Sequence, residues 1–340
     1  MDKVGIIGFG KMGRIRFDTI TSSNYGQVLK VYDKTQIEGD FDVAKNPDEI
    51  INDSEISSVF ICTPNFLNYS LTKQALEAGK NVFCEKPPAF TSKEVQTLID
   101  VEQRSGKNLM YGFNHRHHAS IKEMKRIIDS GEFGKVLWMR GRYGKSVDQD
   151  FFKEWRSKRE LSGGGILIDQ GIHMLDLFLY IGGDFDNVHA AISNLYWKLD
   201  VEDNVFATLI NSKTGLVASL HSTMTQWRHM FSLEVFLEKG YLVINGLKTS
   251  SGTYGDEILT IAKNRSTAPA ATWEDEVRKE YEVDDSWNSE ILEFFESIRD
   301  GRQVQFGNSD DALRLMRLVD KIYSYRDEQL HPDQKTFQTP

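Results

Sequence analysis

Hydrophobic positions in the first part of the chain occur in short runs, separated by longer stretches with helical spacing. The runs predict buried β-strands, and the stretches between them predict amphipathic helices. The predicted strands are 4–7, 27–32, 57–62, 81–84 and 108–112, and the predicted helices are 11–23, a short one from about 48, 65–78 and 91–105. Strands that alternate with helices in this way form right-handed crossovers and a doubly wound parallel sheet.

The pattern changes after about residue 117, where apolar and polar residues begin to alternate. This two-residue period predicts a mostly antiparallel sheet with one covered face. Strands are predicted at 135–143, 187–199, 204–210, 216–224, 231–237 and 241–244, helices at 120–130, 287–299 and 309–325, and a loose polar tail from 327. The predicted fold class is α/β, with a doubly wound parallel sheet in a domain at 1–117 and a large, mostly antiparallel open sheet in an α/β domain at 118–340. We expect the final helices to pack back across the domains.

Composition excludes several classes of protein. A chain of 340 residues with 40% hydrophobic and 27% charged residues is typical of a globular protein with room for two domains. A net charge of -9 argues against nucleic-acid binding, which needs basic surface. The longest membrane candidate, 163–183, is interrupted by Asp169, His173 and Asp176, so no membrane span is expected. The amino terminus shows no signal-peptide pattern, and the cytoplasm is the expected compartment.

The two cysteines, Cys62 and Cys84, each close a predicted core strand. Free cysteines in such positions behave as small hydrophobic residues. We expect both to be buried thiols.

Three glycines follow the first predicted strand in G-x-G-x-x-G spacing. Gly8 permits a tight turn, Gly10 lets the backbone approach a pyrophosphate, and Gly13 lets the next helix pack against the strand. That helix would point free N–H groups and the positive end of its dipole at the phosphates. The pattern predicts a dinucleotide site made by Gly8, Phe9, Gly10, Lys11, Met12 and Gly13.

Asp33 ends the second apolar run, twenty residues after Gly13. An acid at this distance typically meets the adenosine ribose, accepting from its 2′-OH and repelling a 2′-phosphate. Asp33 therefore favours NAD over NADP, although the neighbouring cation, Lys34, could tolerate the phosphate. The alternative interpretation makes Asp33 an ordinary turn residue at a strand end.

Two polar loops follow the third and fourth predicted strands, and ligands of parallel sheets lie outside the carboxyl ends of the strands. The loops contain Thr63, Pro64 and Asn65, and Glu85, Lys86 and Pro87. We expect both loops beside the cofactor. Lys86 could place its ammonium near nicotinamide and substrate, where like charges would depress its pKa and its charge would stabilise an alkoxide. In isolation, a surface lysine in a proline-stiffened loop is the more ordinary interpretation.

A second candidate cluster lies on an apolar helix predicted after the glycines at 163–165. The helix is apolar nearly all round, so it should be buried. Asp169 and His173 stand four residues apart and share a face, with Asp176 further along. The histidine could take a hydroxyl proton, and Asp169 could hold a substrate hydroxyl or orient the imidazole. A structural Asp–His pair that satisfies itself in the core is an equal alternative.

Together these residues resemble the Gfo/Idh/MocA oxidoreductase family, which includes relatives of glucose–fructose oxidoreductase and inositol dehydrogenase. The matching segments are 8–13, 63–65, 85–87, 114–116, 155–156 and 163–176. The resemblance implies a Rossmann domain followed by an α/β domain with an open sheet, often used in dimers or tetramers. It also implies nicotinamide-dependent oxidation or reduction of a sugar, cyclitol or sugar nucleotide. By motif, Lys86, Asp169 and His173 take the catalytic positions.

The chain departs from the family pattern in two places. Asn68 stands where many members have histidine, and 117–119 reads His-His-Ala where many have Asp-Pro. His115, His117 and His118 resemble a metal cluster on paper, but no fourth ligand is near in sequence and the family reaction needs no metal, so no metal is expected. Substrate contacts are expected among Arg116, Arg142, Tyr143, Trp155, Arg156, Asp169 and His173, with Trp227 and Arg228 as further candidates. For any single one, a place on a sheet face or at an interface is the alternative.

The sequence thus predicts an NAD(H)-dependent dehydrogenase or reductase acting on a carbohydrate, as a homodimer or homotetramer. Substrate would lie over the nicotinamide between the domains. Two other functions stay open at this point. One is a glycosidase that oxidises its sugar transiently with bound NAD, and the other is a non-catalytic NAD-binding sensor or partner protein.

Overall fold

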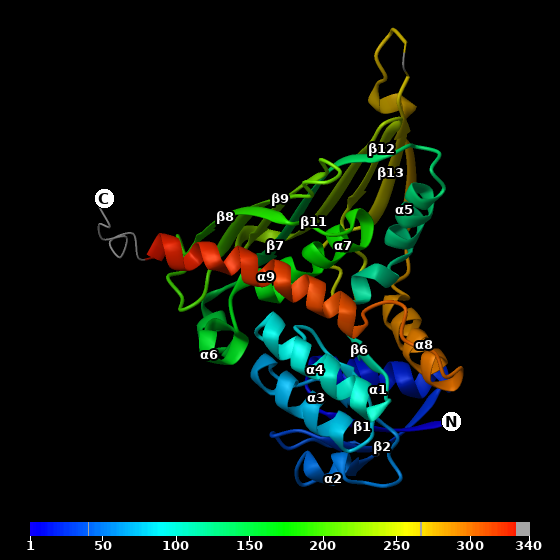
Figure 1. Ribbon diagram of the computed structural model, residues 1–340, viewed down its shortest axis with the longest axis vertical. Helices are drawn as coiled ribbons and strands as arrows, with labels where there is room; N and C mark the ends of the chain where they lie inside the picture. The colour runs from blue at the N-terminus through cyan, green and yellow to red at the C-terminus, as the bar shows by residue number, and fades with distance from the viewer. Residues whose placement is uncertain (40, 266, 331–340) are drawn as a thin grey trace. The chain divides into compact units, whose positions relative to one another are not determined.

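The computed structural model describes residues 1–39, 41–265 and 267–330, and the chain divides into two compact units (Figure 1). The first unit consists of Met1–Ala119, Glu160–Gly163 and Asp285–Met316, and the second of Ser120–Arg159, Gly164–Asp284 and the chain from Arg317 onward. The first unit therefore joins the amino-terminal region to a segment from near the other end of the sequence.

The first unit is built on a six-stranded sheet with the order β3-β2-β1-β4-β5-β6, in which every pair is parallel. The strands are β1 (Asp2–Ile7), β2 (Gly26–Tyr32), β3 (Asp42–Val43), β4 (Ser58–Ile61), β5 (Asn81–Cys84) and β6 (Leu109–Tyr111). This order is that of a doubly wound dinucleotide-binding sheet, which confirms the predicted fold class. Strand β3 is not predicted from the sequence, because its two residues are exposed and carry no apolar run.

The helices of the first unit are α1 (Lys11–Ser23), α2 (Asp48–Ile51), α3 (Asn68–Glu77), α4 (Ser92–Ser105) and α8 (Ser286–Arg299), with 3₁₀ turns at Asn65–Leu67 and Asn114–His117. The bounds of α4 follow from local chemistry. Thr91 and Glu94 form a capping box at its start, and Gly106, with a φ of +65°, ends it in the left-handed conformation. Sequence signals therefore locate this helix to within a residue.

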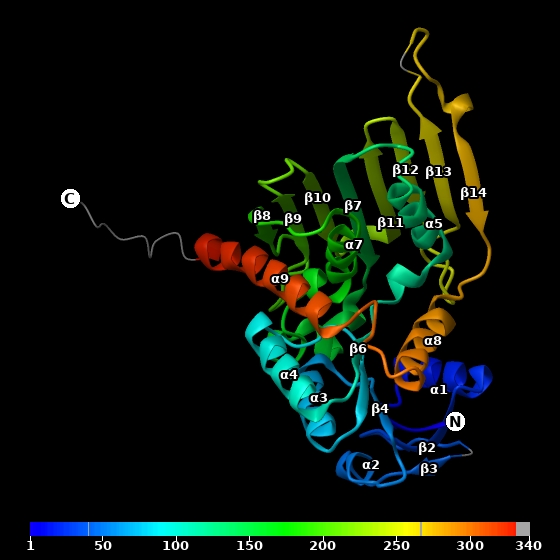
Figure 2. The same ribbon diagram turned by 45° about the vertical axis from the view of Figure 1, so that its right-hand side comes forward.

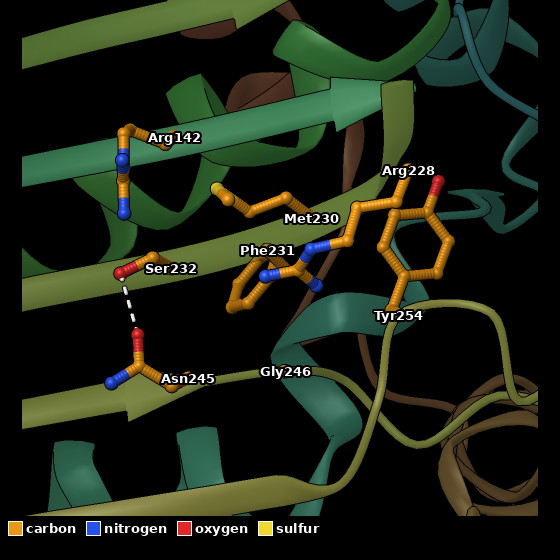
Figure 3. A pocket seen from close by; sticks show the side chains of 8 residues that line it. All are labelled: Arg142, Arg228, Met230, Phe231, Ser232, Asn245, Gly246 and Tyr254. Atoms are coloured by element: carbon orange, nitrogen blue, oxygen red, sulfur yellow. Dashed lines mark hydrogen bonds between the residues drawn. The ribbon is translucent and has the colours of Figure 1, made fainter. Parts of the chain in front are cut away.

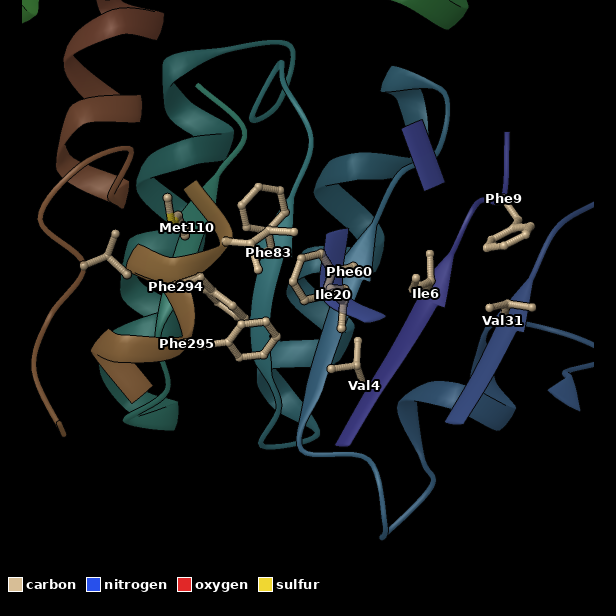
Figure 4. Packing of buried hydrophobic residues seen from close by; sticks show 12 residues of the cluster. Val4, Ile6, Phe9, Ile20, Val31, Phe60, Phe83, Met110, Phe294 and Phe295 are labelled. Atoms are coloured by element: carbon tan, nitrogen blue, oxygen red, sulfur yellow. The ribbon is translucent and has the colours of Figure 1, made fainter. Parts of the chain in front are cut away.

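Helix α8 contributes to the core of the first unit although it lies some two hundred residues further along the chain (Figure 4). Phe60 and Phe83 stack at a centroid distance of 4.9 Å on neighbouring central strands. Phe294 of α8 meets both rings edge-on, at 5.4 and 5.8 Å. Removing a buried phenylalanine of this kind costs roughly 3–5 kcal/mol of folding free energy. The parallel sheet thus depends on the carboxyl-terminal segment for its packing.

The second unit contains an eight-stranded sheet with the order β14-β13-β12-β11-β7-β10-β9-β8, antiparallel except for the pair β7 and β10. The strands are β7 (Val136–Ser146), β8 (Asn187–Ser193), β9 (Asn204–Ile210), β10 (Val217–Thr223), β11 (Thr225–Leu237), β12 (Gly240–Asn245), β13 (Glu257–Lys263) and β14 (Val277–Tyr281). Helices α5 (Ala119–Asp129) and α7 (Ile172–Gly182) belong to the second unit. Helix α6 (Arg159–Ser162) lies almost wholly in the first unit, and α9 (Ser309–Leu330) begins in the first unit and continues in the second. The mostly antiparallel sheet is as predicted, but β13 and β14 are missing from the prediction.

One face of this sheet is covered by helices and the other is open, with α5 and α7 on the same side (Figure 2). Side chains of β7 alternate accordingly, because successive residues of a strand point to opposite faces. Met139 and Tyr143 are buried, and a Cβ on Gly141 would lie 2.4 Å from the sulfur of Met174 in α7. Trp138, Arg140 and Arg142 on the opposite face are exposed.

Strand β8 ends at Ser193, six residues before the predicted end at 199. The buried carboxylate of Asp203 accepts hydrogen bonds from the backbone N–H groups of Leu195, Tyr196 and Trp197 at 2.8–3.0 Å. A carboxylate that collects three successive N–H groups bends the chain into a turn. The apolar residues at 195–197 therefore belong to a loop and not to the end of a strand.

Helix α9 continues to Leu330 and thus passes residue 327, where the sequence predicts a loose tail. The rest of that predicted tail, 331–340, lies outside the described residues. Of the two cysteines, Cys84 is buried as predicted, but Cys62 is only half-buried, because it lies just beyond the end of β4.

One helical stretch, Arg159–Gly182, is long and apolar enough to cross a membrane, which corrects the expectation that no described segment approaches a span. However, 78% of its 18-residue apolar window is buried inside the fold. A core helix passes the same test of length and composition. The stretch is therefore weak evidence for a membrane.

Candidate functional site

The turn after β1 requires glycine at two positions for different reasons. Gly8 has a φ of +90°, and a Cβ on it would lie 2.5 Å from the carbonyl oxygen of Cys62. A Cβ on Gly13 would lie 2.1 Å from the carbonyl oxygen of Gly8, so only glycine lets α1 pack this closely. Gly10 differs, since a Cβ there would meet no atom within 4 Å. The space over Gly10 is open to a ligand.

Helix α1 starts at this open space without a side-chain cap and without an acidic residue in its first turn. Its first N–H groups are therefore left for an anion, which the helix dipole also favours. Lys11 is exposed and Met12 is half-buried at the same helix end, whereas Phe9 is buried against Phe17 and Phe41. The open glycine and the uncapped helix end fit the pyrophosphate of a dinucleotide.

Asp33 follows β2 and ties its end to the glycine turn. One carboxylate oxygen accepts from the backbone N–H of Phe9 at 2.6 Å, and the other accepts from the N–H and hydroxyl of Thr35 at 2.9 and 2.8 Å. Partial burial raises the pKa of Asp33, but the hydrogen bonds from Thr35 and Phe9 outweigh it and lower the pKa below its ordinary value. An ionised carboxylate has further lone pairs that could accept from a ribose hydroxyl, so the turn role and the ribose role are compatible. Lys34 beside it is exposed.

Asn68 joins the two loops that follow β4 and β5. Its amide nitrogen donates to the carbonyl oxygens of Glu85 and Pro87 at 3.1 and 2.8 Å, and its amide oxygen accepts from the hydroxyl of Thr63 at 3.2 Å. The side chain is fully buried. From the sequence, Asn68 is notable only because many family members have histidine at this position. In the structure, it fixes the loop that carries Lys86.

The remaining predicted residues of these loops have structural contacts of their own. The amide nitrogen of Asn65 donates to the carbonyl oxygen of Ser162 at 2.8 Å, and Pro64 is half-buried before it. Glu85 accepts from the Nε of Arg16 at 2.8 Å. Lys86 is half-buried immediately after this acid. The side chains of Asn65 and Glu85 are thus engaged in contacts within the first unit.

Arg16 is the centre of a buried ion network that the sequence does not reveal. The guanidinium lies 2.7 Å from carboxylate oxygens of both Glu85 and Glu290, and its side chain is 0% exposed. It also stacks over the rings of Phe83 and Trp287 at 4.4 and 4.8 Å. Burial opposes its charge, but Glu290 and Glu85 more than compensate and raise its pKa. The network joins α1, α8 and the loop before Lys86.

Arg116, a predicted substrate residue, is buried and lies 2.6 Å from the carboxylate of Asp311 within the first unit. His115, His117 and His118 in the same segment are also buried. Within the described residues, no group of three or more His, Cys, Asp and Glu side chains is placed to hold a metal ion.

In the second unit, Asp169 lies within reach of two cations. Its carboxylate oxygens are 2.9 Å from the Nζ of Lys145 and 3.6 Å from the Nε of Arg156. Lys145 was not singled out in the sequence, although the two-residue period of β7 puts it on the same face as Tyr143. Arg156 also stacks on its neighbour Trp155 at 4.4 Å. Trp155 and Arg156, both predicted substrate residues, are therefore placed beside this carboxylate.

The backbone around Asp169 is not the regular α-helix that the spacing predicts. Leu167–Gly171 form a π turn, and α7 begins after it, with His173 in its first turn. The carboxylate of Glu202, contributed by another loop, accepts from the N–H groups of Gly165 and Leu167 at 2.8 and 3.2 Å and fixes the start of this segment. Such wide turns occur frequently at functional sites.

His173 is 5% exposed, and its ring lies 6.2 Å from the ring of Tyr143. Tyr143 in turn meets Tyr254 edge-on at 5.4 Å. Burial raises the pKa of Tyr143 well above its ordinary value, and Tyr254 and Asp169 raise it further. Asp176 is fully buried further along α7. Tyr143 is therefore a neutral hydrogen-bonding group between the candidate histidine and Tyr254.

The structure thus gathers the predicted residues into two sets. The loops after β1, β2, β4 and β5 bring Gly8, Asp33, Thr63 and Lys86 to the carboxyl edge of the first sheet. The second unit places Asp169, Arg156, Tyr143 and His173 around the π turn. Arg142 is directed to the open face of the second sheet and is separate from this set.

Comparison with known proteins agrees with both units. Residues 3–113 match the model of an oxidoreductase family described as having an NAD-binding Rossmann fold, and residues 121–243 match the GFO/IDH/MocA C-terminal domain. The chain belongs to the Gfo/Idh/MocA oxidoreductase family. Its first unit is accordingly an NAD-binding Rossmann domain.

Relatives in the family include named dehydrogenases. Levoglucosan dehydrogenase of Pseudarthrobacter phenanthrenivorans is 29% identical over 58% of this chain and 57% of its own length. Myo-inositol 2-dehydrogenase of Thermotoga maritima is 22% identical over 92% of this chain and 93% of its own length. A solved structure of levoglucosan dehydrogenase with NADH and levoglucosan has a TM-score of 0.83, with 22% identity over 96% of this chain and 97% of that one. This family member therefore shares its fold along nearly the whole chain with that structure.

Proposed function

We propose that this Gfo/Idh/MocA protein is an NAD(H)-dependent oxidoreductase that transfers hydride at a hydroxyl or carbonyl carbon of a sugar, cyclitol or sugar nucleotide. The observation that carries the proposal is the open space over Gly10 at the uncapped start of α1, in a Rossmann domain that the family model describes as NAD-binding. The substrate class is supported by the names of two relatives, levoglucosan dehydrogenase and myo-inositol 2-dehydrogenase.

For the cofactor, the N–H groups at the start of α1 would bind the pyrophosphate and Asp33 would accept from the ribose. The ionised state of Asp33, which its hydrogen bonds favour, supports NAD over NADP, because a carboxylate repels a 2′-phosphate. Bound nicotinamide supplies a reversible hydride acceptor.

For the substrate, we assign His173 to exchange the hydroxyl proton and Asp169 to hold the hydroxyl or the imidazole. Lys145 and Arg156 lie near the carboxylate of Asp169 and fix its position, and a carboxylate accepts hydrogen bonds. Lys86 would stabilise negative charge on the substrate oxygen. Its loop is held by Asn68 and by the Arg16 network, which suits a group whose position must be fixed.

The first experiment is mass spectrometry of the purified protein for retained nucleotide. A thermal-shift panel of polyols, sugar acids and nucleotide sugars in the presence of NAD should follow, because ligands of the native state raise its apparent stability. Lys86→Ala should then lower turnover of the selected substrate by roughly a hundredfold or more, with NAD affinity within a few-fold.

Lys93→Ala is a matched control, since Lys93 is exposed on the next helix of the same unit. Binding of NAD without turnover of any member of a broad sugar panel would contradict the catalytic proposal. Full activity of Lys86→Ala would contradict the role of this lysine.

We further propose that the protein forms a homodimer or homotetramer through the open face of its second sheet. Trp138 and Phe206 are 37% and 50% exposed there, and Trp138 stacks on Phe236 at 4.0 Å. Exposed apolar patches of this kind mark interaction surfaces. Both cysteines are free thiols, which fits the reducing cytoplasm as the site of action. Light scattering of the purified protein measures the oligomeric state.

A further inference from the structure

A pocket of about 180 Å³ lies in the second unit, where β7, β11 and β12 meet the loop that carries Tyr254 (Figure 3). Two of the residues that line it are arginines, Arg142 of β7 and Arg228 of β11. Among the residues that the structure describes, no acidic side chain lines it. This is unusual for a chain whose net charge is -9.

The charge of Arg142 is not neutralised, in contrast to that of its neighbour on the same face. Arg140 lies opposite Glu234 across the β7–β11 pair and donates to both of its carboxylate oxygens at 2.8 Å. Arg142 lies opposite Ser232 instead. In the part of the chain that the structure describes, no ion pair is found for Arg142 or Arg228, and Arg228 reaches only the carbonyl oxygen of His229, at 3.5 Å.

Ser232 and Asn245 supply further polar groups to the pocket. The buried hydroxyl of Ser232 donates to the amide oxygen of Asn245 at 2.9 Å (Figure 3). This bond uses one lone pair of the amide oxygen and leaves the NH₂ group of Asn245 as a donor. The pocket thus combines two guanidinium groups and a carboxamide NH₂ with the apolar surfaces of Phe231 and Tyr254.

We propose that this pocket binds a small oxyanion, a phosphate or a carboxylate group. Guanidinium groups match such ligands with paired hydrogen bonds, which are stronger than those between neutral partners. The cavity is smaller than the roughly 300–1,000 Å³ of sites for drug-sized ligands, so it suits an anionic group and not a whole nucleotide.

The pocket is linked to the candidate active site through its aromatic residue Tyr254, although Arg142 itself lies on the open face of the sheet. Tyr254 lines the pocket and meets Tyr143, and the ring of Tyr143 lies 6.2 Å from that of His173. The anion is therefore either carried by an acidic or phosphorylated sugar or is a free ion that acts beside the site. A sugar-borne anionic group and a free anion would make the same interactions with the two arginines.

The test is calorimetric titration of the full-length protein with inorganic phosphate, which needs no turnover and is independent of the proposed dehydrogenase activity. Arg142→Gln and Arg228→Gln should each weaken phosphate binding by roughly tenfold or more, since each removes a charge-assisted interaction. The control is the double variant Arg140→Gln, Glu234→Gln, which changes the same face of the sheet without altering its net charge. It should bind phosphate within about twofold of the wild type.

Failure of the wild type to bind phosphate at millimolar concentration would overturn the proposal, as would equal weakening in the control. So would variants that bind phosphate normally but change the oligomeric state in light scattering, because the arginines would then serve a contact between copies. Glucose 6-phosphate, with glucose as the neutral control, distinguishes the sources. Tighter binding of glucose 6-phosphate than of phosphate assigns the pocket to a sugar-borne group, and equal binding assigns it to a free anion.

Discussion

The Nζ of Lys145 lies 2.9 Å from a carboxylate oxygen of Asp169, and the two side chains are only 20% and 14% exposed. The pair joins β7 to the π turn before α7. Because Asp169 is one of the groups proposed to act on substrate, Lys145 is a positioning residue for this acid. Without this close cation, the half-buried carboxylate would be less well fixed.

Lys145→Met removes the ammonium but keeps much of the side-chain volume. We expect kcat to fall by roughly tenfold or more, since the carboxylate of Asp169 loses the ammonium that fixes its position. Lys145→Arg should recover most of the activity. Lys153→Met, which changes an exposed lysine of the same unit, is the control. A loss of stability in Lys145→Met without any loss of kcat would show that the pair has only a structural role.

Two glycines of the turn after β1 allow effects on NAD binding to be separated from effects on folding. Gly10→Ala should fold normally, because Gly10 has a φ of -72° and its Cβ would meet no atom within 4 Å. Its methyl group would instead occupy the space proposed for the pyrophosphate, and we expect NAD affinity to fall by roughly tenfold or more. Calorimetry with NAD measures the effect, and wild-type affinity would argue against a pyrophosphate at this position.

Gly13→Ala is the matched counterpart. Its Cβ would lie 2.1 Å from the carbonyl oxygen of Gly8, a contact with backbone that cannot be relieved by a rotamer change. We expect the free energy of unfolding to fall by about 2 kcal/mol or more, measured by urea denaturation, whereas Gly10→Ala should stay within about 0.5 kcal/mol of the wild type. Equal stability of the two variants would contradict this account of the turn.

Asn68→Ala tests the link between the loops after β4 and β5. The substitution leaves two buried carbonyl oxygens without their donor and the hydroxyl of Thr63 without its acceptor. We expect a loss of about 2–4 kcal/mol in the free energy of unfolding, together with a lower kcat because the loop of Lys86 is less firmly held. Gln74→Ala, on the exposed side of the same helix, should change neither quantity appreciably. A loss of stability without any effect on kcat would separate Asn68 from the function of Lys86.

Glu102 of α4 makes stability depend on pH. Burial raises its pKa to about 7, although hydrogen bonds from Ser309 and Leu109 act in the opposite direction. An acid whose pKa is raised by folding contributes stability below its unfolded pKa and loses it as the pH rises through the folded value. The protein should therefore lose stability between about pH 4.5 and pH 7, by up to about 3 kcal/mol from this group.

Glu102→Gln removes this titration while keeping an acceptor for the N–H of Leu109. Urea denaturation should show the variant to be about 1–3 kcal/mol more stable than the wild type at about pH 8 and nearly equal to it at about pH 5. The exposed Asp100→Asn on the same helix serves as the control. A gain of the same size at both values would mean that ionisation of Glu102 is not its cause.

The sequence by itself was sufficient to predict those structural features that depend on residues close together in the chain. The turn from Gly8 to Gly13 follows from backbone requirements within six positions, and the bounds of α4 follow from its own capping residues. The period of apolar residues distinguishes the parallel sheet from the mostly antiparallel one, because burial on two faces or on one leaves a different pattern. The buried helix that carries His173 was visible for the same reason, although Asp169 lies in the π turn before it.

Only the tertiary structure decided the features that join distant segments. Strand β14 lies at the edge of the second sheet and is mostly exposed, since an edge has less to bury, and its largely buried neighbour β13 was also missed. The π turn is fixed by Glu202, and Phe294 completes a core whose strands lie near the other end of the sequence. Lys145 pairs with Asp169 although the two residues are 24 positions apart in the sequence. The spacing of apolar residues does not reveal such a contact. Local chemistry determines the elements and the candidate residues, but the partner of each buried charge is chosen by the fold, because an ion pair requires proximity in space and not in sequence.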